Sequence, residues 1–138
     1  VDEAEKLLRR ALQISPKDAW SFVGLSRCHY RQGKRDEALQ DLRRAAEVQP
    51  DDGFVQLELG QAYEQHNRTR EALEAYDKAI RLLRLPDAYF RKAQLLAKSD
   101  PARARDAWKG FLEAIEAMGG PASESDRVRV EMAKRVLQ

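Results

Sequence analysis

The sequence has 138 residues, of which 43% are hydrophobic and 35% are charged, a composition typical of a folded chain with long helices. Its 25 basic residues are nearly balanced by 23 acidic ones, so the net charge of +2 disfavours nucleic acid as the main partner. No apolar run approaches the length of a membrane span, so membrane insertion is not expected.

Most of the chain has the residue pattern of amphipathic helices, with apolar residues recurring at the three- and four-residue spacing of one helix face. The breaks between these segments carry proline, glycine or asparagine, which are residues that end helices. Gly33 and Asn67 tolerate a left-handed backbone, and Asp18 and Asp52 are typical N-terminal caps. The predicted helices cover residues 2–14, 18–32, 35–48, 53–65, 69–84, 87–98, 101–117 and 123–137.

These segments repeat with a period of 34 residues. Ala4, Ala38 and Ala72 are separated by this interval, and each stands near the start of a predicted helix. Because several residue series share the period, the sequence predicts a protein whose repeated units pack against their neighbours. Two further series with the same interval are Leu8, Leu42 and Tyr76, and Ala11, Ala45 and Ala79.

These residues resemble the tetratricopeptide repeat, in which one helix carries small and large apolar residues and the next carries alanine, a bulky residue and alanine. The resemblance extends over roughly the first 118 residues. It implies an all-α fold, a right-handed superhelix of stacked antiparallel helix pairs known as a TPR-like solenoid. It also implies an inner groove that is lined by the first helix of each unit.

The resemblance divides the chain, taken as a single array over residues 1–138, into units. Residues 1–16 form the second helix of a truncated unit, 19–50 and 53–85 are full units, 86–118 are a divergent unit, and 122–138 are a capping helix. In the last segment we expect Val128, Met132 and Val136 to form one apolar stripe. The alternative for this segment is the first helix of a further, truncated unit. The start at Val1, without an initiating methionine or an apolar leader, predicts a piece of a longer protein.

The first helices of the units carry the predicted binding residues. Those expected to face the groove stand one step away from the packing stripe and are aromatic, aliphatic, basic or amide side chains. The candidate groove residues are Trp20, Val23, Arg27, Tyr30, Arg31, Phe54, Leu57, Gln61, Phe90, Arg91, Gln94 and Lys98.

This lining predicts a protein or peptide partner with apolar anchors and some acidic character. Tryptophan, tyrosine and arginine are the residue types that most often dominate the energy of an interface. A second interpretation is that Trp20 and Phe54 pack on the preceding helix, near Leu12 or Val48.

Catalytic and metal sites are not expected. His29 falls in line with the helix core, and His66 lies in a turn, so they form no metal-ligand pattern with the single Cys28. Cys28 is expected to be a buried, inert thiol, and a lone cysteine excludes a disulfide within the chain. We therefore expect no enzyme activity, no catalytic residues, no bound metal and no cofactor.

Two other functions stay open. Apolar residues on the first helix, Leu7, Leu8 and Leu12, favour a homodimer formed through terminal helices. The chain could instead be a regulatory or localising arm of a larger enzyme. The compartment is unknown: a cytoplasmic setting is favoured, and a periplasmic one stays open.

Overall fold

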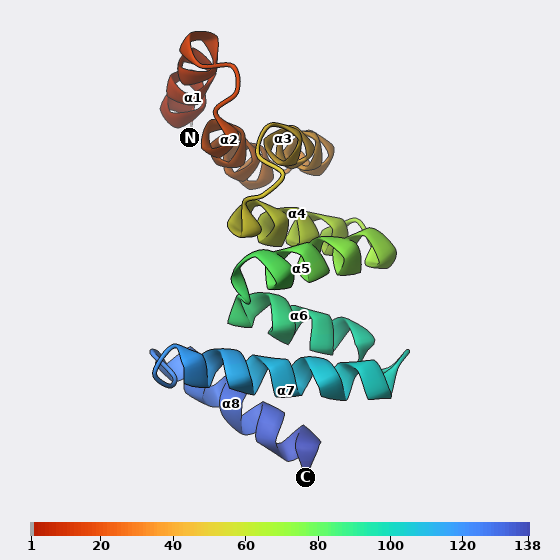
Figure 1. The fold of residues 1–138 in the computed structure, drawn as a ribbon. Helices are drawn as coiled ribbons and strands as arrows, with labels where there is room; N and C mark the ends of the chain where they lie inside the picture. The colour runs from red at the N-terminus through yellow and green to blue at the C-terminus, as the bar shows by residue number, and fades with distance from the viewer. Residues whose placement is uncertain (1) are drawn as a thin grey trace.

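The computed structural model describes residues 2–138, and over that range the chain is all-α (Figure 1). Each predicted helix is present, with ends that differ from the prediction by at most two residues. The helices are α1 (Asp2–Ile14), α2 (Ala19–Arg31), α3 (Arg35–Val48), α4 (Gly53–Gln65), α5 (Thr69–Leu83), α6 (Pro86–Leu96), α7 (Pro101–Ala117) and α8 (Glu124–Leu137).

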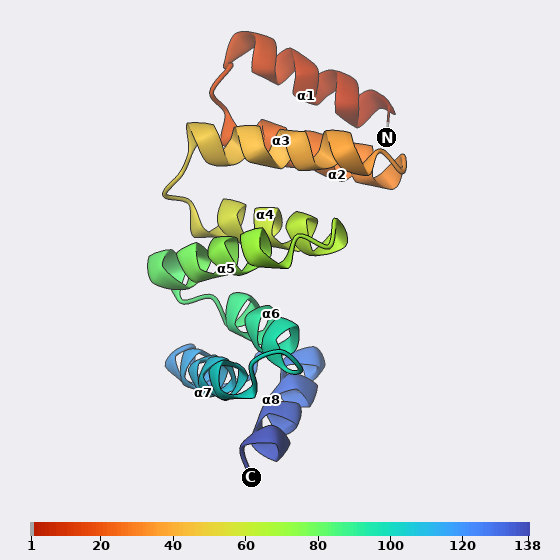
Figure 2. The ribbon, with the colours of Figure 1, turned by 90° about the vertical axis from the view of Figure 1, so that its right-hand side faces the viewer.

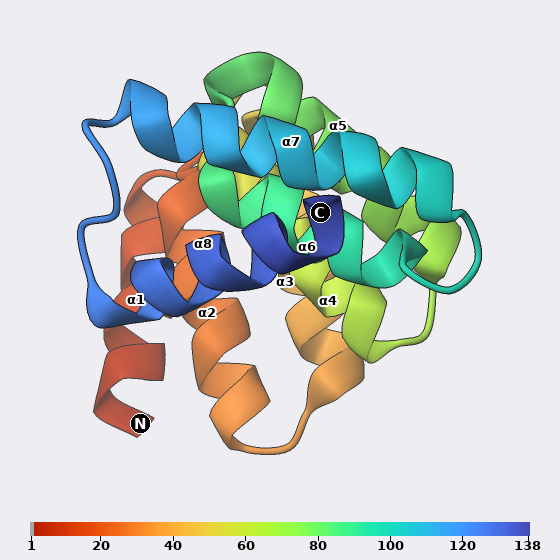
Figure 3. The ribbon, with the colours of Figure 1, turned by 90° about the horizontal axis from the view of Figure 1, so that it is seen from below.

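The helices form stacked antiparallel hairpins. Helix α2 pairs with α3, α4 with α5 and α6 with α7, and each hairpin packs on the next (Figures 1 and 2). Helix α1 covers one end of the stack, and α8 lies across the other end (Figure 3). Because α2 also contacts α4, the first helices of successive hairpins adjoin. The fold is therefore a helical-repeat superhelix, as predicted.

The predicted signals at the helix ends are confirmed. The Asp18 side chain accepts a hydrogen bond from the Trp20 backbone N–H at the start of α2. Asp52 caps α4 in the same way, and Gly33 and Asn67 have left-handed φ angles of 77° and 56°. These caps and turns satisfy backbone groups that the helices leave unpaired, so they fix where each hairpin reverses.

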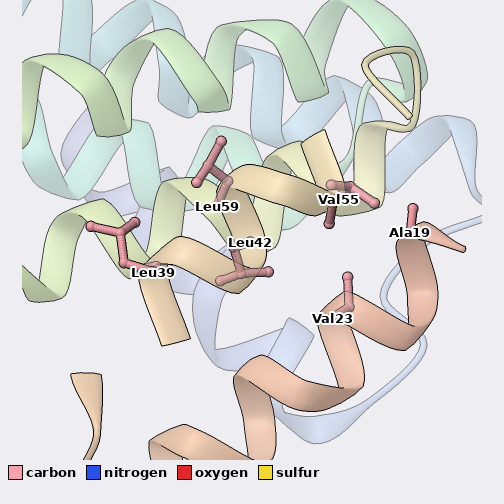
Figure 4. Close-up of a cluster of buried hydrophobic side chains, with 8 residues drawn as sticks. Ala19, Val23, Leu39, Leu42, Val55 and Leu59 are labelled. Atoms are coloured by element: carbon pink, nitrogen blue, oxygen red, sulfur yellow. The ribbon is translucent and has the colours of Figure 1, made fainter. Parts of the chain in front are cut away.

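The apolar core runs through the stack as a series of clusters between neighbouring hairpins. One cluster joins α2, α3 and α4, and its side chains point toward one another from the three helices (Figure 4). Alanine at several of its positions allows the helix backbones to approach closely. The labelled members of this cluster are Ala19, Val23, Leu39, Leu42, Val55 and Leu59.

A buried polar pair joins α2 to α3. His29 lies in the interior, as predicted, and its Nδ1 is 2.5 Å from Asp41 Oδ2. Burial raises the pKa of the Asp41 carboxyl, although the hydrogen bond to His29 lowers the pKa in part. The pair therefore satisfies two buried polar side chains that would otherwise destabilise the core.

Helix α8 packs through residues outside the apolar stripe predicted for it. Its inner face contributes Ala133, with Val130 and Leu137, to the cluster between α6 and α7. The Arg129 guanidinium forms an ion pair with Asp87 and lies 4.3 Å from the centre of the Phe90 ring. The predicted stripe is exposed on the outer face of the helix; it consists of Val128, Met132 and Val136.

Candidate binding groove

The exposed residues of α2 and α4 include several of the predicted groove residues. Trp20 and Phe54 stand at the start of these two helices, with 46% and 49% of their surfaces exposed. Arg27, Tyr30 and Arg31 follow toward the end of α2 and are also exposed. Exposed aromatic and arginine side chains on adjoining helices form a surface that is suited to contact with another chain.

Three of the predicted groove residues are instead buried, so the prediction that they are exposed there is wrong, although Leu57 borders a hollow that is described below. Val23 belongs to the cluster between α2, α3 and α4, and Leu57 packs in the cluster that contains Tyr76. Phe90 lies in the aromatic cluster of α6 and α7. The reason is that a position one step from the packing stripe on a first helix also meets the neighbouring hairpin.

The remaining predicted residues lie on α4 and α6. Gln61 is half-buried and lines a hollow that is bordered by α2, α3 and α4. Arg91 is half-buried, whereas Gln94 and Lys98 are exposed. The predicted residues therefore do not form one continuous surface. The exposed residues of α2 and α4 lie on adjoining helices, whereas on α6 Phe90 is buried and Arg91 is half-buried.

We call the hollow that is bordered by α2, α3 and α4 the basic hollow. Its volume is about 240 Å³, and its charged lining consists of three arginines and one glutamate. The Arg27 guanidinium donates a hydrogen bond of 2.8 Å to Glu58, and no ion pair involves Arg31 or Arg35 among residues 2–138. The hollow therefore presents an excess of positive charge. It is lined by Ser26, Arg27, Tyr30, Arg31, Arg35, Ala38, Leu42, Glu58, Gln61, Ala62, Gln65 and His66.

Among the lining residues of the basic hollow that are absent from the predicted set, Arg35 and His66 lie outside the first helices. Arg35 starts α3, and its guanidinium lies 5.8 Å from the centre of the Tyr30 ring. His66 lies in the turn after α4, which the sequence indicated only as a solvent-exposed turn. The signal that could have found them is the repeat itself, because turns that follow successive first helices lie at the same end of the stack.

A second hollow, which we call the apolar hollow, lies where the starts of α4, α6 and α8 meet the end of α7. It has a volume of about 210 Å³, an apolar lining and two carboxylates, Asp87 and Asp126. Asp87 is paired with Arg129, whereas Asp126 is hydrogen bonded to the Ala122 backbone N–H. The lining residues are Phe54, Leu57, Leu85, Pro86, Asp87, Ile115, Met118 and Asp126.

The exposed Trp20 is held in place by the next unit. Its indole Nε1 donates a 3.0 Å hydrogen bond to Asp52 Oδ2. The other oxygen of Asp52 accepts hydrogen bonds from the backbone N–H groups of Phe54 and Val55. The same carboxylate therefore caps α4 and orients the indole, so Trp20 does not pack simply as an apolar side chain on the preceding helix.

A buried polar cluster joins α4, α5 and α6. The Tyr76 hydroxyl donates a hydrogen bond to Glu64. The pKa of Tyr76 is raised strongly, mainly because the side chain is buried and also because the Glu64 carboxylate lies beside it. Arg91 Nε is buried without a hydrogen-bond partner in the described part of the chain. Arg91 stands 34 residues after Leu57 and 68 after Val23, so a cation occupies a position that is aliphatic in the two earlier units.

Comparisons with known proteins identify the repeat. Two family models, each described as tetratricopeptide repeat, match residues 1–53 and 57–117. The chain belongs to the tetratricopeptide repeat family. Tetratricopeptide domains are typically non-catalytic, and membership of the family supports a protein–protein interaction scaffold. No curated protein matches the sequence significantly.

Solved structures with the same fold include tetratricopeptide arrays of low sequence identity. A crystal structure of MamA is 18% identical and has a TM-score of 0.73, with 99% of this chain and 86% of that chain covered. A second MamA structure gives 16% identity, a TM-score of 0.72 and coverages of 99% and 78%. A mutant O-GlcNAc transferase from Thermobaculum terrenum is 21% identical, with a TM-score of 0.70 over 80% of this chain and 22% of that chain.

Two further properties of this tetratricopeptide array concern metal binding and membrane spanning. Within residues 2–138, no three His, Cys, Asp or Glu side chains come together as a potential metal site. None of the described helices combines the length and the apolar character needed to traverse a bilayer.

Proposed function

We propose that this tetratricopeptide array binds a peptide segment of a partner protein along the exposed side of α2 and α4. The observation that carries the proposal is the pair of half-exposed aromatic side chains, Trp20 and Phe54, at the same position of adjoining first helices. Large apolar side chains are costly to leave in water, and an interface recovers that energy. Phe54 lines the apolar hollow, the basic hollow lies farther along α2 and α4, and both offer space for side chains of a bound peptide.

The orientation of Trp20 supports the same proposal. Its indole is fixed by Asp52 before any partner arrives. Fixing an aromatic side chain in advance reduces the entropy that binding must otherwise remove. The aromatic surface is therefore organised in the free protein.

Truncating either aromatic side chain is expected to weaken binding by about 1–2 kcal/mol, or roughly five- to thirtyfold. Peptides would be selected from a displayed random library on the unaltered protein, and their affinities measured by fluorescence anisotropy. The variants are Trp20→Ala and Phe54→Ala. The control is Leu82→Ala, which removes an exposed apolar side chain of α5 that lines neither hollow.

Circular dichroism would show that the variants keep their helicity. The proposal fails if the selected peptides bind Trp20→Ala and Phe54→Ala as tightly as the unaltered protein. It also fails if Leu82→Ala weakens binding equally, because the selected peptides would then use another face.

Self-association is a second candidate function, because both outer helices expose apolar side chains. Leu7 and Ile14 lie two turns apart on α1, and the exposed stripe of α8 is centred on Met132. These are two different surfaces at opposite ends of the stack, so their contact would join copies end to end.

In that case, we expect the mass measured by light scattering to rise with protein concentration, and Met132→Glu to abolish the rise. A charge at the centre of the stripe would have to be buried without a partner in such a contact. Constant monomer mass over the concentration series would rule this association out.

A further inference from the structure

We infer that the groove recognises a bipartite extended peptide: an apolar residue next to a basic residue in the apolar hollow, and acidic residues in the basic hollow. This inference rests on the proposed function and specifies the chemistry of the partner. It follows from the opposite charges of the two hollows and from their spacing along one helix.

The charges of the basic hollow favour carboxylate side chains. Three arginines face a single carboxylate, Glu58, which is already hydrogen bonded to Arg27. Arg31 and Arg35 are thus available to pair with acidic residues of a peptide.

The carboxylates of the apolar hollow favour a positively charged group of the peptide. Phe54, Leu57 and Met118 supply apolar surface, and Asp126 adds a carboxylate without a basic residue in the lining. Asp87 also lines this hollow, although Arg129 compensates part of its charge. An apolar side chain fits this lining, and a neighbouring lysine or arginine of the peptide would pair with Asp126.

The distance between the hollows sets the spacing within the peptide. Helix α4 lines both of them, the apolar hollow through Phe54 and Leu57 and the basic hollow through Glu58, Gln61 and Gln65. At 1.5 Å per residue, the α4 residues that line the two hollows are centred roughly 9 Å apart along the helix. An extended peptide covers that distance in about three residues, at roughly 3.3 Å per residue.

Synthetic labelled peptides test this inference directly. The matched peptide carries Lys-Leu, a three-residue Gly/Ser spacer and Glu-Glu, and the reversed-charge peptide carries Glu-Leu, the same spacer and Lys-Lys. We expect the matched peptide to bind about fivefold or more tightly at low salt, the size expected from a few partly exposed charge pairs. Added salt should reduce this preference because it screens exposed charges.

Variants and a spacer series assign the preference to the two hollows. The double variant Arg31→Glu with Arg35→Glu should lose or reverse the preference. The control double variant, Arg10→Glu with Arg81→Glu, makes the same change in net charge on exposed arginines of α1 and α5 and should keep it. A matched peptide with a nine-residue spacer should bind more weakly than the peptide with three residues.

The inference is overturned if both charge patterns bind equally, if none of these peptides binds, or if the preference survives in the Arg31→Glu, Arg35→Glu protein. Equal binding of the long-spacer peptide would overturn the spacing and favour a helical ligand. If library peptides still depend on Trp20 and Phe54 while charge has no effect, the proposed function stands and only this inference fails.

Discussion

Replacing Phe111 by alanine is expected to lower the free energy of unfolding by about 3–5 kcal/mol, the usual cost of removing a fully buried phenylalanine. Phe111 has no exposed surface, and its ring centre lies 5.8 Å from that of Phe90 and 6.1 Å from that of Trp108. Removing it would leave a cavity among rings that α6 and α7 hold in place. Chemical denaturation followed by circular dichroism would measure the loss, and Phe111→Leu should cost only about 1.5 kcal/mol or less.

A second measurement shows which helices are destabilised in Phe111→Ala. In a stacked array, each unit is stabilised mainly by its immediate neighbours. Hydrogen exchange in Phe111→Ala should therefore accelerate in α6, α7 and α8, while amides of α2 and α3 keep most of their protection. Equal acceleration in all helices would contradict this view and indicate a single cooperative unit.

Replacing Gly60 by alanine is expected to destabilise the protein by about 1–3 kcal/mol, although alanine is intrinsically the better helix former by roughly 1 kcal/mol. A Cβ atom at Gly60 would lie 2.5 Å from Tyr76 Cε1 and 2.7 Å from Cδ1. The Tyr76 ring is fully buried and its hydroxyl is hydrogen bonded to Glu64, so the ring has no free space into which to move. The backbones of α4 and α5 would have to separate.

Gly24 offers the matched control for this overpacking. A Cβ atom there would lie 2.8 Å from Leu8 Cδ2, which is the end of a flexible side chain on α1. Leu8 is only half-buried, so it can change rotamer. We expect Gly24→Ala to be neutral or slightly stabilising in thermal denaturation. Equal stability of Gly60→Ala and Gly24→Ala would show that the contact between Gly60 and Tyr76 does not limit packing.

Most of the fold could be predicted from the sequence because its determinants are local and repeated. Asp18 and Asp52 as caps, and Gly33 and Asn67 as left-handed residues, specify helix ends independently of the rest of the chain. The largest error in a helix boundary is at the end of α6, which ends at Leu96, two residues before the predicted end. No strong stop signal such as glycine or proline follows that helix directly, so its end depends on packing.

The candidate site was predicted less completely because it depends on how the units are arranged. Helical periodicity places Trp20 and Arg27 outward but does not distinguish a groove surface from the contact between two hairpins, where Val23 is buried. The apolar hollow brings Phe54 together with Met118, which is 64 residues later in the chain. That proximity depends on the angles between successive hairpins, and a residue pattern within one helix carries no information about them.

The double role of Asp52 has a mechanical consequence for the array. One carboxylate accepts hydrogen bonds from both the backbone at the start of α4 and the indole of Trp20, so it connects two neighbouring units. A ligand that turns the indole away from Asp52 would break this exposed hydrogen bond, whereas the cap of α4 is made by the other carboxylate oxygen. Rotation of the indole would therefore remove one polar contact between the first and second full units.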